Sequence, residues 1–180
     1  MKKTVLTFGL ISGAVIAILM LATIPFVDQI GFGKGELIGY TTMILSFMLV
    51  FFGIRSYREN IGNGTITFGR AFAVGILITL VTCGCYVVTW EIMYFKLMPG
   101  FVEKYASYMV AQLKASGASQ QVIEAKLQEM KGFKAMMDNP FINAAFSFIE
   151  PLPVGLLITL ISAAILRKKS SPPSAAIPSL

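Results

Sequence analysis

Long apolar stretches without charged side chains dominate the chain. Such stretches cover residues 5–27, 37–54 and 72–90, and aromatic side chains follow the last of them up to residue 95. A helix needs about 20 mostly apolar residues to cross a hydrocarbon core about 30 Å thick. The pattern therefore predicts three transmembrane helices, over about 5–27, 37–54 and 72–95.

A fourth apolar stretch covers residues 141–166, but Glu150 and the sequence Pro151-Leu152-Pro153 interrupt it. We interpret it as a fourth span with an internal break, because proline removes a helical hydrogen bond. The fold class predicted is an all-α integral membrane protein, a four-helix transmembrane bundle in a single membrane domain over residues 1–169. Residues 170–180, rich in Ser, Pro and Ala without charge, predict a disordered cytoplasmic tail.

The segments between the spans differ in length and pattern. Gly31, Gly33 and Gly35 predict a short flexible loop between the first two spans. The long segment 96–140 instead shows helical periodicity twice, with Gly117 and Ser119 between the two parts. It predicts an extracytoplasmic helical hairpin between spans 3 and 4. The apolar face of this hairpin must be covered by the bundle, the membrane surface or a partner.

The basic residues predict the orientation in the membrane. Cytoplasmic loops of membrane proteins carry an excess of Lys and Arg. One side of the predicted topology carries a single acid, Glu59, and a set of basic residues: Lys2, Lys3, Arg55, Arg58, Arg70, Arg167, Lys168 and Lys169. We therefore expect both termini in the cytoplasm, with the N-terminal apolar stretch kept as the first span.

Composition narrows the classes of function. The chain is 56% hydrophobic and only 13% charged, which indicates lipid as its solvent. It contains no histidine, so the commonest general base and metal ligand are missing. We predict no enzymatic activity, no catalytic residue, no metal and no cofactor. The net charge is +6, and the distribution of the basic residues along the chain fits a membrane topology. We therefore expect no nucleic-acid partner.

Glu91 and Glu150 are the candidate ion or proton site. Both lie near the predicted outer boundary of the hydrocarbon, where a carboxylate is costly and often functional. Two close carboxylates could bind a proton, a cation or a basic partner. The alternative, which we favour, is that they are interfacial residues that reach water, with Lys96 near enough to supply a counter-charge.

Small residues four positions apart indicate close helix packing. Gly9 and Gly13 lie in the first span, and Ala71 and Gly75 lie at the start of the third. Small side chains at this spacing let helix backbones approach in lipid. We favour packing within the bundle, with a homo-oligomer as the alternative.

The cytoplasmic arginines Arg55, Arg58 and Arg70 could bind an anionic lipid headgroup. Each basic residue near an anionic surface gains only about 1 kcal/mol. The same arginines also satisfy the positive-inside rule. We favour this second interpretation.

The chain resembles a bacterial family of small four-span membrane proteins known only as a domain of unknown function. The resemblance rests on the Lys-rich start, on the segment 64–75 (GTITFGRAFAVG) that enters the third span, on Asp138-Asn139-Pro140 and on the basic end of the last span. It implies a bacterial cytoplasmic-membrane location and assigns no catalytic or binding residue.

Three classes of function remain on the sequence. The leading hypothesis is a non-enzymatic accessory or interaction component, with segment 96–140 binding a membrane or extracytoplasmic protein. The alternative is a small oligomeric transporter or channel that uses Glu91 and Glu150. An intramembrane enzyme is the least favoured, because no nucleophile or metal motif is present.

Overall fold

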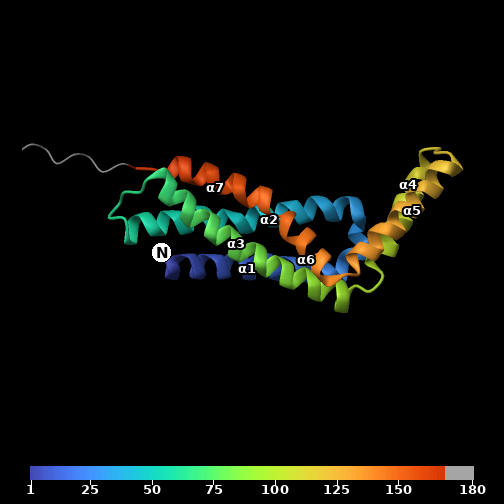
Figure 1. Ribbon diagram of the computed structural model, residues 1–180, viewed down its shortest axis with the longest axis horizontal. Helices are drawn as coiled ribbons and strands as arrows, with labels where there is room; N and C mark the ends of the chain where they lie inside the picture. The colour runs from blue at the N-terminus through green and yellow to red at the C-terminus, as the bar shows by residue number, and fades with distance from the viewer. Residues whose placement is uncertain (169–180) are drawn as a thin grey trace, which may run out of the picture.

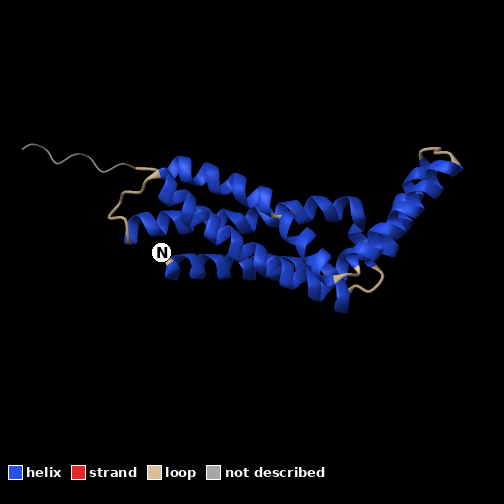
Figure 2. Cartoon of the chain, viewed as in Figure 1, coloured by secondary structure: helices blue, strands red, loops and turns tan. Residues whose placement is uncertain are grey.

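The computed structural model describes residues 1–168, so the predicted tail over 170–180 lies outside the described residues. Every regular segment of the described part is helical (Figure 2), apart from an isolated antiparallel bridge between Ile66 and Lys168. Four helical segments are long and apolar enough to cross a membrane: Lys2–Phe26, Gln29–Asn60, Phe68–Leu97 and Pro140–Leu166. The predicted all-α fold with four such segments is confirmed.

The spans are built from the following elements: α1 (Lys2–Thr23), a short 3₁₀ turn (Ile24–Phe26), α2 (Val27–Asn60), α3 (Phe68–Ile92) continued by a π-helical turn (Met93–Leu97), α6 (Pro140–Ile149) and α7 (Leu152–Leu166). Helix α3 packs against α1, α2, α6 and α7, so it forms the centre of the bundle (Figure 1). The N-terminus and the end of α7 lie at one end of the bundle.

Small and hydroxyl side chains allow the helices to approach closely. Ser12 of α1 donates a hydrogen bond to the carbonyl of Ser46 in α2 (2.7 Å), and the hydroxyls of Thr79 in α3 and Thr159 in α7 are 3.0 Å apart. All four side chains are buried. In lipid, packing and such hydrogen bonds hold helices together, because there is little hydrophobic driving force between them.

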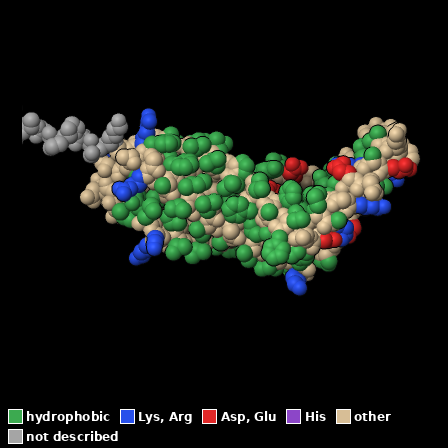
Figure 3. All heavy atoms as spheres, viewed as in Figure 1, with side chains coloured by type: hydrophobic (Ala, Val, Ile, Leu, Met, Phe, Trp, Pro, Cys, Tyr) green, Lys and Arg blue, Asp and Glu red, His purple; other side chains and the backbone are tan. Residues whose placement is uncertain are grey.

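The surface of the bundle is apolar where a membrane would surround it. Large hydrophobic side chains are strongly exposed, for example Leu37 (70%), Ile165 (65%) and Ile18 (64%). Figure 3 shows hydrophobic side chains over the middle of the bundle, with Lys and Arg towards the two ends of the molecule. An apolar surface this extensive is typical of a protein that lipid surrounds.

The predicted flexible loop around Gly31, Gly33 and Gly35 is wrong. Helix α2 already begins at Val27, and the chain bends inside it at Gly31, whose φ of 69° and ψ of 163° suit only glycine. This one residue makes the bend, and Gly33 and Gly35 lie within the helix that follows it. Gly33 also lies close to α4, since a methyl group there would be 3.1 Å from the Tyr108 hydroxyl.

Two helices connect the third and fourth spans, α4 (Phe101–Ala115) and α5 (Gln120–Met137). Gly117 turns the chain between them with a φ of 75°, and the Ser119 hydroxyl accepts a hydrogen bond from the backbone N–H of Val122. The pair extends from the end of the bundle opposite the N-terminus (Figure 1). The side of the membrane on which it lies stays a prediction.

Candidate functional site

A cavity of about 570 Å³ lies where the bundle meets the base of α4 and α5. Its walls come from α1, the N-terminal part of α2, α3, α4, α5 and α6. A volume of several hundred Å³ is in the range of small-molecule sites. The cavity is therefore the principal candidate site in the described part of the chain.

The bend at Gly31 places the start of α2 against α4. The next residue, Phe32, packs its ring against Phe101, Tyr105 and Tyr108, with centroids 5.6, 5.3 and 5.4 Å apart. Offset and edge-to-face aromatic pairs at such distances are favourable. This cluster fixes α4 on α2 and closes one side of the cavity, which Phe32, Phe101 and Tyr105 line.

Tyr86 and Trp90, one turn apart on α3, form a second wall. The Tyr86 hydroxyl donates a hydrogen bond to Glu150 Oε2 (2.8 Å), and Trp90 Nε1 donates one to Asn143 Oδ1 (3.0 Å). Asn143 is fully buried on α6, and its Nδ2 donates to the carbonyl of Met137 (2.9 Å). These bonds join α3, the end of α5 and α6, and they keep the buried amide satisfied.

The break in the fourth span borders the cavity. Helix α6 ends at Ile149 and α7 begins at Leu152, as the proline pair at 151 and 153 predicted. Pro151 and Pro153 have no backbone N–H, so the carbonyls of Ser147 and Ile149 lack their usual helical donor. Ser147 and Glu150 both line the cavity. The break therefore lies beside the cavity wall, with the carboxylate of Glu150 next to it.

The charged side chains on the cavity walls are acidic. Glu36 of α2 and Glu150 line it, and none of its described lining residues is Lys or Arg. All acidic side chains visible in Figure 3 lie towards the end of the molecule that carries α4 and α5. The cavity is thus suited to positive rather than negative ligands.

Glu91 is outside the set of residues that line the cavity, whereas Glu150 belongs to it. It is on α3, directly after Trp90, and the Oε1 of Glu91 is buried without a hydrogen-bond partner. Within residues 1–168, no hydrogen bond or ion pair joins Glu91 to Glu150 or to Lys96. The partner of Glu150 is Tyr86 instead.

The four small residues predicted for helix packing are all buried in the bundle. Gly9, Gly13 and Gly75 are in close contact with neighbouring helices. A methyl group on Gly9 would lie 2.7 Å from Val81 Cβ on α3, and one on Gly13 would lie 2.6 Å from Cys85 Cβ. On Gly75 it would lie 2.7 Å from Thr159 Cγ2 on α7. Ala71 is fully buried in the core.

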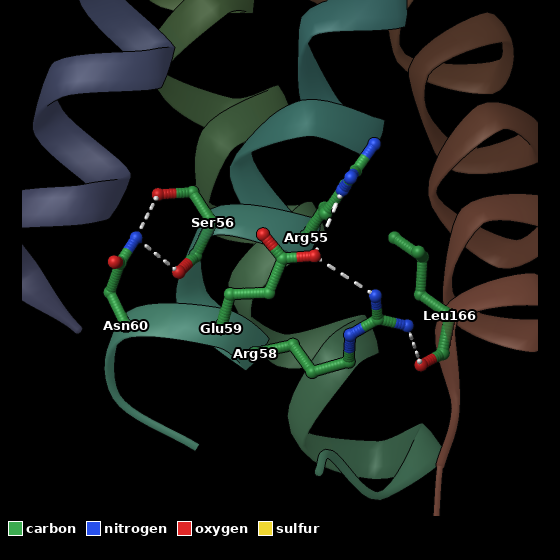
Figure 4. Close-up of polar contacts among 6 residues, drawn as sticks. All are labelled: Arg55, Ser56, Arg58, Glu59, Asn60 and Leu166. Atoms are coloured by element: carbon green, nitrogen blue, oxygen red, sulfur yellow. Dashed lines mark hydrogen bonds and ion pairs between the residues drawn. The ribbon is translucent and has the colours of Figure 1, made fainter. Parts of the chain in front are cut away.

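The predicted arginines do not form one cluster. Arg55 and Arg58 both contact the carboxylate of Glu59 (3.0 and 3.2 Å), and Arg58 also donates to the carbonyl of Leu166 at the end of α7 (3.3 Å), as Figure 4 shows. These contacts tie α2 to α7. Arg70 lies exposed in the first turns of α3 and is outside this network.

A polar network holds the base of α5. Asp138 accepts hydrogen bonds from Lys134 and from the Tyr94 hydroxyl (3.1 Å), and Lys134 lies 3.4 Å from Glu103 of α4. The hydrogen bond from Lys134 lowers the pKa of Asp138, and the same bond raises the pKa of Lys134. The network is exposed, so it orients the α4–α5 base without adding much stability.

Sequence reasoning missed the roles of Tyr86, Trp90, Asn143 and Glu36. Their spacing offered one signal, because Tyr86 and Trp90 share a helix face, as do Asn143 and Ser147. That these two faces meet follows only from the fold.

The comparisons with known proteins give one match. A family model described as "Protein of unknown function (DUF4199)" matches residues 7–168. Neither the curated proteins nor the solved structures contain a match. The family match covers the α4–α5 pair, the cavity and the bundle except for the first residues of α1.

Proposed function

The chain belongs to the DUF4199 family, whose function is unknown, and we propose that it is a non-enzymatic interaction component of the bacterial cytoplasmic membrane. Its partner is a membrane or extracytoplasmic protein that binds the α4–α5 pair. The proposal depends on the surface of that pair more than on any chemical site.

The observation that carries the proposal is an apolar hollow between α4 and α5. It measures about 360 Å³ and is lined by Met109, Leu113, Val122 and Ala125, and also by Lys126 and Glu129, which form an ion pair (2.8 Å). Val122 is 48% exposed. Because the pair extends from the bundle, an apolar side chain of a partner can enter this hollow and displace water from it.

The orientation is part of the proposal. The N-terminus, the turn between α2 and α3 and the end of α7 lie at one end of the bundle, and the predicted cytoplasmic basic residues belong to these segments (Figure 1). The positive-inside rule therefore supports a cytoplasmic location for that end. The α4–α5 pair is then extracytoplasmic, where it can meet a partner.

The transporter alternative has less support. It uses Glu91 and Glu150, and no hydrogen bond or ion pair of the described residues joins these two carboxylates. We therefore prefer the interaction component.

The test is site-specific crosslinking in intact cells. In a Cys83→Ala, Cys85→Ala background, Ala125→Cys puts a photo-crosslinker inside the hollow, and Gln128→Cys puts it on an exposed position of α5 outside the hollow. We expect one heterologous protein to be captured from position 125 and not from position 128. Adding Val122→Asp should abolish that capture, because it places a charge in the hollow.

The same cysteines test the orientation. A membrane-impermeant maleimide should label Ala125→Cys in intact cells and leave Lys3→Cys unlabelled until the cells are opened. Equal capture from positions 125 and 128, or crosslinks to other copies of this chain alone, would contradict the proposed partner site. Labelling of Lys3→Cys from outside would reverse the proposed orientation.

A further inference from the structure

The cavity at the base of α4 and α5 has walls suited to an apolar body. Side chains such as Ile16, Met43, Phe101 and Phe133 line it, and its volume is about 570 Å³. Burial of apolar surface in such a space is favourable. A compact apolar molecule of several rings or a short branched chain fits this space and gains affinity from it.

The charged groups on the walls have one sign. Glu150 lies at the break between α6 and α7, and Glu36 lies on α2. Both carboxylates are exposed, and one oxygen of Glu150 is fixed by the Tyr86 hydroxyl at 2.8 Å. The C-terminal end of α6 adds the negative end of a helix dipole at the same place. The described lining contains no Lys or Arg that would neutralise these groups.

Aromatic side chains line the cavity together with the carboxylates. Tyr40, Tyr86, Trp90 and Tyr105 all line the cavity. The face of such a ring attracts a cation within about 6 Å of its centroid, and the attraction survives when the cation has no hydrogen atom to donate. A quaternary ammonium or phosphonium group is therefore accommodated as well as a protonated amine.

From these observations we propose that the cavity binds a lipophilic organic monocation, with its charged centre near Glu150 and Tyr86 and its apolar body among the helices. A metal ion is disfavoured, because residues 1–168 contain no group of three or more acidic, Cys or His side chains placed to hold one. An anion of the same shape is repelled by both carboxylates. The inference does not depend on the proposed partner of α4–α5.

The first experiment compares two ions of nearly the same shape and opposite charge. The full chain, reconstituted in nanodiscs of phosphatidylglycerol, is titrated with tetraphenylphosphonium and with tetraphenylborate, and empty nanodiscs correct for partition into lipid. We expect saturable binding of the phosphonium alone. Equal saturable binding of both ions, or of neither, overturns the proposal without any mutation.

Variants then locate the site. Glu150→Gln should weaken phosphonium binding by about tenfold, and Glu36→Gln should weaken it less, because Glu150 stands beside the aromatic wall. The matched control is Glu91→Gln, which changes an acid of α3 outside the cavity and should leave the affinity unchanged. Wild-type affinity in the double variant Glu36→Gln, Glu150→Gln overturns the proposal.

A steric variant keeps both charges. Gly39 lines the cavity, and a side chain added there meets no atom within 4 Å at its first carbon, so Gly39→Leu fills space without disturbing the helix contact. Gly84→Leu is the control, since Gly84 is equally free of neighbours and lies outside the cavity. We expect Gly39→Leu to abolish saturable binding. Wild-type binding by Gly39→Leu would overturn the assignment to this cavity.

One further experiment distinguishes a lipid from a free molecule as the source of the cation. The ammonium group of a lipid and a free lipophilic cation present the same chemistry to the cavity. Replacing part of the phosphatidylglycerol with phosphatidylethanolamine should compete with the phosphonium if the natural occupant is an aminolipid. Unchanged affinity assigns the site to a free cation, and both results support a cation site.

Discussion

The contact between α1 and α3 at Gly13 yields the most direct test of the bundle. A methyl group at position 13 would lie 2.6 Å from Cys85 Cβ and would also overlap Cys85 Sγ. Ordinary carbon contacts are about 3.5–4.0 Å. The helices must therefore separate by about 1 Å to accept Gly13→Ala, because the atom in the way is joined to the α3 backbone and cannot rotate aside.

The magnitude follows from two opposing effects. Overpacking of this kind costs about 1–3 kcal/mol, and replacing a helical glycine with alanine gains up to about 1 kcal/mol. Gly84→Ala, on α3, has no atom within 4 Å of the added methyl group and gains only the second effect. We expect Gly13→Ala to be about 1–3 kcal/mol less stable than Gly84→Ala.

The assay is reversible unfolding of the full chain in mixed micelles, followed by helical circular dichroism during titration with sodium dodecyl sulfate. Cys85→Gly should partly restore the stability of Gly13→Ala in a double-mutant cycle, because it removes both overlapping atoms. Equal stability of Gly13→Ala and Gly84→Ala would refute the close approach. A change in dimer fraction with no change in unfolding would assign Gly13 to a homo-oligomer instead.

Three further predictions concern the base of α4–α5 and the bend. The hydrogen bond from Lys134 lowers the pKa of Asp138. The stability that this bond adds is therefore present above the usual carboxyl pKa and is lost as the pH falls through the lower pKa of the folded state. Fluorescence of Trp90, the single tryptophan, should report a transition below about pH 4, and the Asp138→Asn variant should lack it. Asn143→Ala leaves the part-buried indole N–H of Trp90 without its acceptor and should lower the free energy of unfolding by about 1–3 kcal/mol. A loss below about 0.5 kcal/mol would contradict this hydrogen bond. Gly31→Ala forces a side chain into a backbone conformation that only glycine adopts, so it should cost about 1–3 kcal/mol and increase hydrogen exchange at the start of α2; unchanged exchange would contradict the bend.

The sequence by itself determined the membrane class, the helical fold and the break in the fourth span. These properties are local, because hydrophobic length decides whether a helix can cross lipid and proline removes a specific hydrogen bond. The family also followed from the sequence, through segment 64–75 and the layout of the spans. Its match over residues 7–168 confirms that resemblance, without assigning a function.

Tertiary structure alone decided the site. Glu150 was identified from its cost at membrane depth, but Glu91 was chosen as its partner on depth alone, and depth does not state which face of a helix a residue occupies. Helix rotation and the bend at Gly31 instead bring Tyr86 to Glu150 and make Glu36 a wall of the same cavity. Such positions depend on the packing of whole helices against each other, which no local pattern of residues specifies.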